Sequence, residues 1–207
     1  MFHHIMGFER ALPWLLSALA AGYIAGSVPF GVLVARFFNL GDLRKIGSGS
    51  IGATNVLRTG NKLAAFMTLL LDALKGAVPV LIFLTWKGDL AGQAAGLGAF
   101  LGHCFPVWLR FRGGKGVATA AGIMLAIHPL TGVALCLTWL ATAVLTRISS
   151  AAALVTAASG PLWLICFDRW EAVLFGIILG ALIWARHHAN IRRIIRGEEP
   201  KIGKTGA

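Results

Sequence analysis

Charged residues are scarce in this 207-residue sequence. Only 13% of the residues are charged, whereas 57% are hydrophobic, and the mean hydropathy is +0.76. Because soluble domains carry about 25% charged residues, the composition excludes an ordinary soluble protein and favours a single membrane-embedded domain over residues 1–207. The first apolar run, 11–38, is too long for the apolar region of a cleaved signal peptide. We therefore expect it to remain as a transmembrane helix.

Acidic residues and cysteines are also few. The chain has 8 Asp and Glu against 19 Lys and Arg, a net charge of +11, and three cysteines without metal-ligand spacing, Cys104, Cys136 and Cys166. We read the cysteines as small buried hydrophobes. No acidic pair in the polar loops, no Ser-His-Asp set and no metal cluster is evident, so we expect no metal, no cofactor and no acid–base work by Asp or Glu. In a membrane protein, excess positive charge marks cytoplasmic loops, anionic lipid or anionic substrate rather than nucleic acid.

Apolar stretches dominate the chain. They cover 11–37, 63–86, 90–109, 117–146, 148–167 and 171–186. A helix of about 20 residues crosses about 30 Å of hydrocarbon, whereas 117–146 as one helix would be about 45 Å long. His128-Pro129 lies near its middle, and the residue before proline disfavours helix. This stretch is therefore either one kinked helix or two short helices joined at 128–130.

The distribution of positive charge decides whether the chain has six or seven spans. Seven spans with the N-terminus outside place 15 of the 19 Lys and Arg residues inside, whereas six spans invert the positive-inside rule. The sequence therefore predicts an all-α integral membrane protein with seven transmembrane helices, an outside N-terminus and a cytoplasmic C-terminus. Three polar segments then share the cytoplasmic side, where they could build one site: 47–62, 102–119 and 186–201.

The first polar segment, GSGSIGATNVLRTGNK (47–62), has the composition of an anion site. Its glycines allow sharp turns whose N–H groups can form an anion-binding nest. Arg58 supplies a fork-shaped cation suited to phosphate, and a helix starting near Ala53 would add its N-terminal dipole. The neutral donors are Ser48, Thr54 and Asn55. The alternative is a flexible Gly-Ser connector.

The second segment, GHCFPVWLRFRGGKGVAT (102–119), carries RGGKG at 112–116. This stretch resembles a phosphate loop but lacks the Walker A spacing, so a positive-inside connector is the competing interpretation. His103 precedes it, as either a polar residue capping a helix end or a site residue.

The third segment, RHHANIRRIIRGEEPK (186–201), spaces His187, Asn190 and Arg193 three residues apart. On a helix these lie near one face, and we assign His187 and Asn190 to the site. The remaining basic residues fit a lipid-headgroup anchor.

Two features lie within the apolar stretches. Asp72 and Lys75 share a helix face, as a structural ion pair or as part of a proton or ion path. GSVPFG (26–31) predicts close helix packing or a kink.

Taken together, the three polar segments closely resemble the motifs of the bacterial acyl-phosphate-dependent glycerol-3-phosphate acyltransferases, the PlsY family. GSVPFG and LLDALKG (70–76) look like further family segments in the expected order. The resemblance implies seven transmembrane helices in the bacterial cytoplasmic membrane, with the active site facing the cytoplasm. It implies transfer of an acyl group from acyl-phosphate to the 1-hydroxyl of glycerol-3-phosphate, which gives lysophosphatidic acid and phosphate. This is the first committed step of bacterial phospholipid synthesis.

The resemblance also assigns site residues by motif match. The catalytic set would be Ser48, Arg58, Lys115, His187 and Asn190. The substrate- and phosphate-binding set would be Gly49, Thr54, Asn55, His103, Gly113, Gly114 and Gly116, the last three allowing backbone N–H groups to approach acyl-phosphate. Membrane lipids and a peripheral acyl-phosphate-synthesising enzyme, PlsX, would be partners, the acyl chain would lie in an apolar groove between helices, and substrate phosphate would act as the base. The chain departs from the family pattern at Ser50, which is usually Asn, and at His188, which is usually Arg.

Rival interpretations are an anion transporter and a lipid-binding scaffold. No internal repeat supports the former, and a scaffold would not need three glycine-rich donor loops.

Overall fold

The computed structural model describes residues 2–47 and 49–203, with side chains from Arg10 onward. All regular structure in this part of the chain is helical. The α-helices are α1 (Phe2–Gly26), α2 (Phe30–Phe37), α3 (Ala53–Leu57), α4 (Lys62–Lys87), α5 (Asp89–Cys104), α6 (Val117–Ile127), α7 (Pro129–Thr146), α8 (Ser149–Cys166), α9 (Val173–Arg186) and α10 (His188–Ile195). Short 3₁₀ turns are η1 (Leu43–Lys45), η2 (Val107–Leu109) and η3 (Trp170–Ala172).

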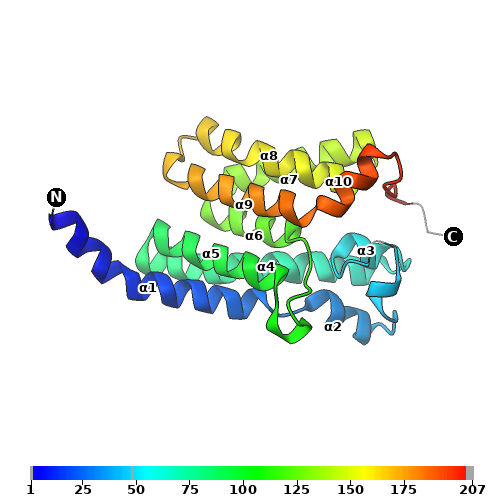
Figure 1. Cartoon of the computed structure of the whole chain (residues 1–207), viewed down its shortest axis with the longest axis horizontal. Coiled ribbons are helices and arrows are strands. Elements are labelled where there is room, and N and C mark those ends of the chain that lie inside the picture. Colours follow the sequence, from blue (N-terminus) through cyan, green and yellow to red (C-terminus); the bar gives the residue numbers. More distant parts are fainter. Residues whose placement is uncertain (1, 48, 204–207) are drawn as a thin grey trace.

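The helices form two groups joined by α6 (Figure 1). Helices α1, α4 and α5 pack together on one side, and α7, α8 and α9 pack together on the other. Helix α6 contacts α4 and α7 and so bridges the two groups. The short helices α2, α3 and α10 lie at the same end of the bundle. The three polar segments are thereby gathered at that end.

Helices long and apolar enough to cross a membrane make up much of the chain. Four segments qualify by length and composition within the described residues, and the bent pair formed by 170–186 and 188–195 makes a fifth. The predicted break at 128–130 is confirmed. His128 is extended (φ −151°, ψ 104°) and caps α7, with Nδ1 accepting from the Thr131 N–H. The count of seven spans and the orientation of the termini stay predictions.

Glycines bring α1 and α5 into backbone contact. A Cβ atom built on Gly22 or Gly26 of α1 would overlap the carbonyl oxygen of Ala95 or Ala99 in α5. Gly98 and Gly102 of α5 meet carbonyl oxygens of α1 in the same way. Small residues permit such close approach between membrane helices. The two helices therefore touch without an intervening layer of side chains.

The predicted irregularity at GSVPFG separates α1 from α2. Helix α1 ends at Gly26 and α2 begins at Phe30. Lys75 Nζ donates to the carbonyl oxygen of Val28 at 2.9 Å and pairs with Asp72 Oδ1 at 2.6 Å. Buried charges near apolar surroundings need such partners. The Asp72–Lys75 pair therefore braces the break, which favours the structural alternative.

The expectation of buried cysteines is correct for Cys104 and wrong for Cys136 and Cys166, which are exposed. The physical reason is that a bilayer is as apolar as a protein core. An apolar sequence context therefore does not separate buried positions from those that face lipid or line a cavity.

Candidate active site

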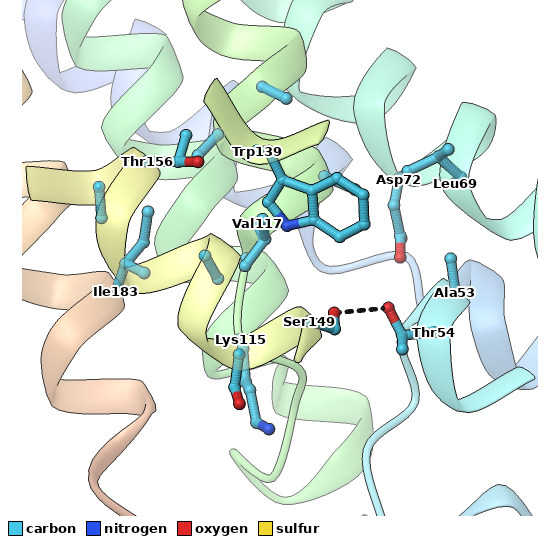
Figure 2. Close-up of a pocket in the computed structure, with 18 of the residues that line it drawn as sticks. Ala53, Thr54, Leu69, Asp72, Lys115, Val117, Trp139, Ser149, Thr156 and Ile183 are labelled. Carbon is cyan, nitrogen blue, oxygen red and sulfur yellow. Dashed lines mark hydrogen bonds between the residues drawn. The ribbon is translucent and has the colours of Figure 1, made fainter. Parts of the chain in front are cut away.

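One cavity of about 600 Å³ lies between the two helix groups. Helices α3, α4, α6, α7, α8 and α9 all contribute to its walls. Figure 2 shows Lys115, Thr54 and Ser149 near one end, with Trp139 and Thr156 further along. The first end carries polar and cationic side chains, and most of the remaining wall is apolar. We call the first end the polar end, and the apolar end opposite it the deep end.

The first polar segment folds around Asn55. Its side chain Nδ2 donates to the carbonyl oxygens of Leu43 (2.8 Å) and Ser50 (2.7 Å), which fixes the loop on both sides of the glycines. Arg58 donates to Asn55 Oδ1 at 3.4 Å. Helix α3 begins at the predicted Ala53. Asn55 therefore orients the loop that carries Arg58 to the cavity wall, and Ser48 lies outside the described residues.

Thr54 connects this loop to the other helix group. Its Oγ1 lies 3.1 Å from Oγ of Ser149, at the start of α8, and the two are hydrogen bonded (Figure 2). The contact closes the polar end of the cavity between α3 and α8. It also brings together residues that are 95 positions apart in the sequence.

The second polar segment is folded onto the end of α5. The N–H groups of Gly113 and Gly114 donate to the carbonyl oxygens of Cys104 and His103, both at 3.1 Å. A Cβ at Gly114 would overlap the His103 ring, and one at Gly113 would overlap the His103 carbonyl oxygen. These two N–H groups are thus occupied, which corrects the expectation that they approach acyl-phosphate. The glycines are required by close packing.

Arg186 holds the same turn from α9. Its guanidinium donates to the carbonyl oxygens of Gly113 (3.4 Å) and Gly114 (3.2–3.3 Å) and stacks over the Phe105 ring. The turn is therefore anchored to α5 by its N–H groups and to α9 by its carbonyl groups. Gly116, with φ +80°, then caps the start of α6 at Val117.

Lys115 projects from this turn into the cavity. Burial of its ammonium group lowers its pKa from 10.5 to about 8. The positive charges of Arg193, Arg58 and Arg186 act in the same direction, whereas Glu199 opposes them. The polar end is therefore a region where an added anion would be favourable, because it would offset several neighbouring cations.

His187 lies at the bend between α9 and α10 and is 2% exposed. Its Nδ1 is 2.8 Å from the Ile183 carbonyl oxygen. Because a carbonyl only accepts, Nδ1 carries the proton and Nε2 is left as an acceptor. Burial lowers the His187 pKa to about 4, with Lys115 and Arg186 adding to the effect. The imidazole is therefore neutral at neutral pH.

Glu199 organises the third polar segment. Its Oε1 accepts from Ser150 Oγ (2.7 Å) and Asn190 Nδ2 (2.6 Å), and its Oε2 accepts from Arg193 Nε (2.7 Å). Burial alone would raise the Glu199 pKa, but these hydrogen bonds outweigh it and lower the pKa. The buried Oδ1 of Asn190 has no hydrogen-bond partner among the described residues. The carboxylate thus joins α8 to α10 beside the cavity.

His103 links three helices at the cavity wall. Its Nδ1 lies 3.2 Å from Thr119 Oγ1 in α6 and 3.7 Å from Asp72 Oδ1 in α4. His103 and Asp72 also line the cavity. His103 therefore both supports helix packing and faces the cavity.

The cavity brings together most of the predicted site residues. Those that line it are Thr54, Asn55, Arg58, His103, Lys115, Gly116, His187 and Asn190. Gly49 and Gly113 instead line a smaller hollow of about 310 Å³ beside Arg44, Arg112 and Arg186. Residues from all three polar segments meet in the larger cavity, as the sequence predicted, and their action as one site stays a prediction.

Residues 16–197 match the family model described as glycerol-3-phosphate acyltransferase. The chain belongs to the glycerol-3-phosphate acyltransferase family. A glycerol-3-phosphate acyltransferase from Cereibacter sphaeroides (strain ATCC 17025) is 55% identical over 95% of this chain and 93% of its own length. One from Jannaschia sp. is 58% identical over 92% of this chain and 93% of its own length.

The fold of this acyltransferase is similar to that of PlsY, described as an integral membrane glycerol 3-phosphate acyltransferase. The crystal structure of its glycerol 3-phosphate form superposes with a TM-score of 0.87, at 36% identity, over 91% of this chain and 96% of that one. The lysophosphatidic acid form gives a TM-score of 0.82, at 34% identity, over 91% and 95%. The chain is therefore an integral membrane acyltransferase.

Sequence reasoning missed several residues at the acyltransferase cavity. Glu198 and Glu199 stand in the third polar segment itself, so the statement that the polar loops hold no acidic pair was wrong. Glu199 and Asp72 both line the cavity. Their signal was present in the sequence, as a carboxylate within a basic segment and a carboxylate within an apolar helix. Ser149, Ser150 and Trp139 also line the cavity, and no spacing pattern marks them.

Proposed function

We propose that this protein transfers an acyl group from acyl-phosphate to the 1-hydroxyl of glycerol-3-phosphate, releasing lysophosphatidic acid and inorganic phosphate. The observation that carries the proposal is a single cavity with a cationic polar end and an apolar deep end. A phosphate-bearing headgroup suits the first part and a long acyl chain suits the second. Membership of the glycerol-3-phosphate acyltransferase family supports the acceptor and the reaction class.

Charge balance supports a donor that carries phosphate. Acceptor and donor would bring two phosphate groups close together, and their repulsion must be offset. Arg58 and Lys115 both line the cavity, and a shared anion would relieve the burial cost of the Lys115 charge. Preorganised cations at a site of developing negative charge are a major source of rate enhancement. In our proposal Arg58 and Lys115 neutralise the two phosphate groups.

His187 and Asn190 suit recognition of a hydroxyl-bearing substrate. Neutral His187 can accept a hydrogen bond at Nε2, while its Nδ1–H is held by the Ile183 carbonyl oxygen. Asn190 offers a buried oxygen without a partner in the described chain. We assign His187 Nε2 to accepting from the 2-hydroxyl of glycerol-3-phosphate, with Asn190 Oδ1 as a second acceptor near the same hydroxyl. This aligns the 1-hydroxyl oxygen for attack and leaves its proton available to substrate phosphate. Such alignment of two bound reactants contributes strongly to the rate.

The proposed step balances without a cofactor. The 1-hydroxyl oxygen attacks the acyl carbonyl carbon, and the bond from that carbon to the phosphate oxygen breaks. The hydroxyl proton passes to substrate phosphate, so the site needs no carboxylate base. Glu199 remains engaged with Ser150, Asn190 and Arg193 throughout. Its role in this mechanism is to hold Asn190 in place.

The wider setting follows from the same proposal. The seven-span topology would place the polar end on the cytoplasmic side of the bacterial inner membrane. Acyl-phosphate is a reactive mixed anhydride, so its supply by a peripheral synthesising enzyme, PlsX, would limit its exposure to water. The product would enter phospholipid synthesis at its first committed step.

Phosphate release by the purified protein in detergent or lipid tests this function. Palmitoyl-phosphate is supplied with and without glycerol-3-phosphate, and palmitoyl-CoA replaces it in a parallel reaction. We expect release that depends on glycerol-3-phosphate and product formation from acyl-phosphate alone. Turnover with palmitoyl-CoA would contradict the proposed donor. No turnover by folded protein would contradict the enzyme, and anion flux into liposomes would then favour transport.

A further inference from the structure

Small residues line the deep end of the cavity. Cys136 of α7, Gly160 of α8 and Gly176 of α9 all line it. They lie 10 or 11 residues from the ends of their helices at Thr146, Ser149 and Arg186. At 1.5 Å per helical residue, each lies about 15 Å from the polar end. Three helices therefore each place a small wall residue at the same depth.

Gly160 differs from the other cavity-lining glycines of this region in what surrounds it. A Cβ built on Gly176 would lie 2.7 Å from Leu164 Cδ1, and one on Gly180 would lie 2.9 Å from the Ala157 carbonyl oxygen. A Cβ built on Gly160 meets no heavy atom within 4 Å, although the residue is buried. Gly176 and Gly180 thus serve helix packing. Gly160 faces empty cavity.

We propose that Gly160 sets the upper limit on the acyl-chain length that this acyltransferase accepts, because its missing side chain leaves the deep end open. The inference rests on the proposed acyl transfer, which places the phosphate at the polar end and the chain along the apolar wall. Trp139 of α7 lines the cavity three residues from Cys136 towards the polar end, and Figure 2 shows its indole between Thr156 on one side and Leu69 on the other. An acyl chain long enough to pass the Trp139 indole would place its terminal methyl group beside Gly160 and Cys136. A larger side chain at either position would occupy the space of the last methylenes of a long acyl chain, whereas a short acyl chain would not reach it.

Gly160→Leu is the direct test, with Ala158→Leu as its matched control. Leucine is preferable to a β-branched residue because position 160 precedes Pro161, where helical backbone is already restricted. Ala158 is exposed on the same helix and does not line the cavity, so the control adds the same side chain outside the site. Cys136→Phe provides a second variant that adds bulk at a similar depth from the neighbouring helix α7.

The readout is a competition within one reaction. Equimolar lauroyl-phosphate and stearoyl-phosphate are mixed with glycerol-3-phosphate, and mass spectrometry gives the ratio of the two lysophosphatidic acid products. This ratio does not depend on how much of a variant is folded, and the substrate mixture is identical for every variant. Because one methylene in an apolar pocket can change kcat/KM by about tenfold or more, we expect Gly160→Leu and Cys136→Phe to shift the ratio at least tenfold towards lauroyl product.

Several results would overturn the inference. A product ratio in Gly160→Leu and Cys136→Phe equal to that of wild type and Ala158→Leu would mean that the chain leaves between helices before it reaches Gly160. Equal losses on both chain lengths would mean a general disturbance of the site. In both cases wild-type turnover remains and the proposed function stands. Wild-type protein that fails to use any acyl-phosphate would remove the proposed function and this inference together.

Discussion

Lys115 is expected to impose an alkaline limit on catalysis. Burial lowers its pKa from 10.5 to about 8, a difference of about 3 kcal/mol in favour of the neutral amine. The proposed function needs the ammonium form to offset substrate phosphate. We therefore expect kcat/KM, which reports on the free enzyme, to fall about tenfold for each pH unit above about 8. With bound substrate the phosphate charge favours the ammonium form, so kcat should fall only at higher pH.

The assay is steady-state phosphate release from pH 6.5 to 9.5, with enzyme-free hydrolysis of acyl-phosphate subtracted at each pH. Lys115→Arg is the control, because guanidinium stays protonated over this range. Its activity can be lower at every pH, but its profile should lack the alkaline fall. A wild-type kcat/KM that stays level to pH 9.5 would refute the reasoning. A fall at the same pH in Lys115→Arg would assign the titration to another group.

The same proton also links Lys115 to stability. Between pH 8 and 10.5 the unfolded chain retains a proton that the folded chain has lost. Stability rises with pH wherever the unfolded state binds more protons. The free energy of unfolding should therefore increase across this window by up to about 3 kcal/mol. Lys115→Arg should not show this increase when unfolding in detergent is followed at several pH values.

Four further predictions concern other parts of the site and fold. Arg58→Ala should lose a charge-assisted contact worth about 1.5–3 kcal/mol, or about 10- to 150-fold in kcat/KM; unchanged turnover at low glycerol-3-phosphate would contradict its assignment. Glu199→Gln should lower the free energy of unfolding by about 1–2 kcal/mol, because an amide cannot replace the charged acceptor of Arg193; an unchanged thermal midpoint in detergent would count against this bond. The Glu199 pKa is lowered, so this stabilisation is present above pH 4.5 and should be lost as the pH falls through the folded-state pKa, which a midpoint measured at descending pH would reveal. Gly26→Val should disrupt the contact with Ala99 and reduce the yield of folded protein, and normal yield would show that the helices can separate.

Features set by local sequence were predictable. The break at His128-Pro129 follows from the restriction on the residue before proline and from the length of the apolar stretch, and the structure has it at that position. The helix at Ala53 follows from the glycine that precedes it. The convergence of three distant segments was predicted from the placement of positive charge and matches the lining of the cavity.

Features that depend on partners distant in the chain were not predictable from spacing. The glycines at 113 and 114 have the composition of a phosphate loop, but their N–H groups are taken by the end of α5. Whether a glycine serves a ligand or a neighbouring helix depends on what packs against it, and composition does not contain that information. Glu199 was overlooked for the same reason, since its role depends on contacts with Ser150 in α8 as well as Asn190.

The glycine contacts between α1 and α5 have a mechanical consequence. Backbone pressed against backbone has no layer of side chains that could change rotamer and absorb a displacement, and packed interiors transmit strain with little compression. The pair should move as one stiff body. The pair packs against α4, which lines the cavity, and so stiffens that wall from behind. Opening and closing of the cavity would then fall to α7, α8 and α9, which line the other wall.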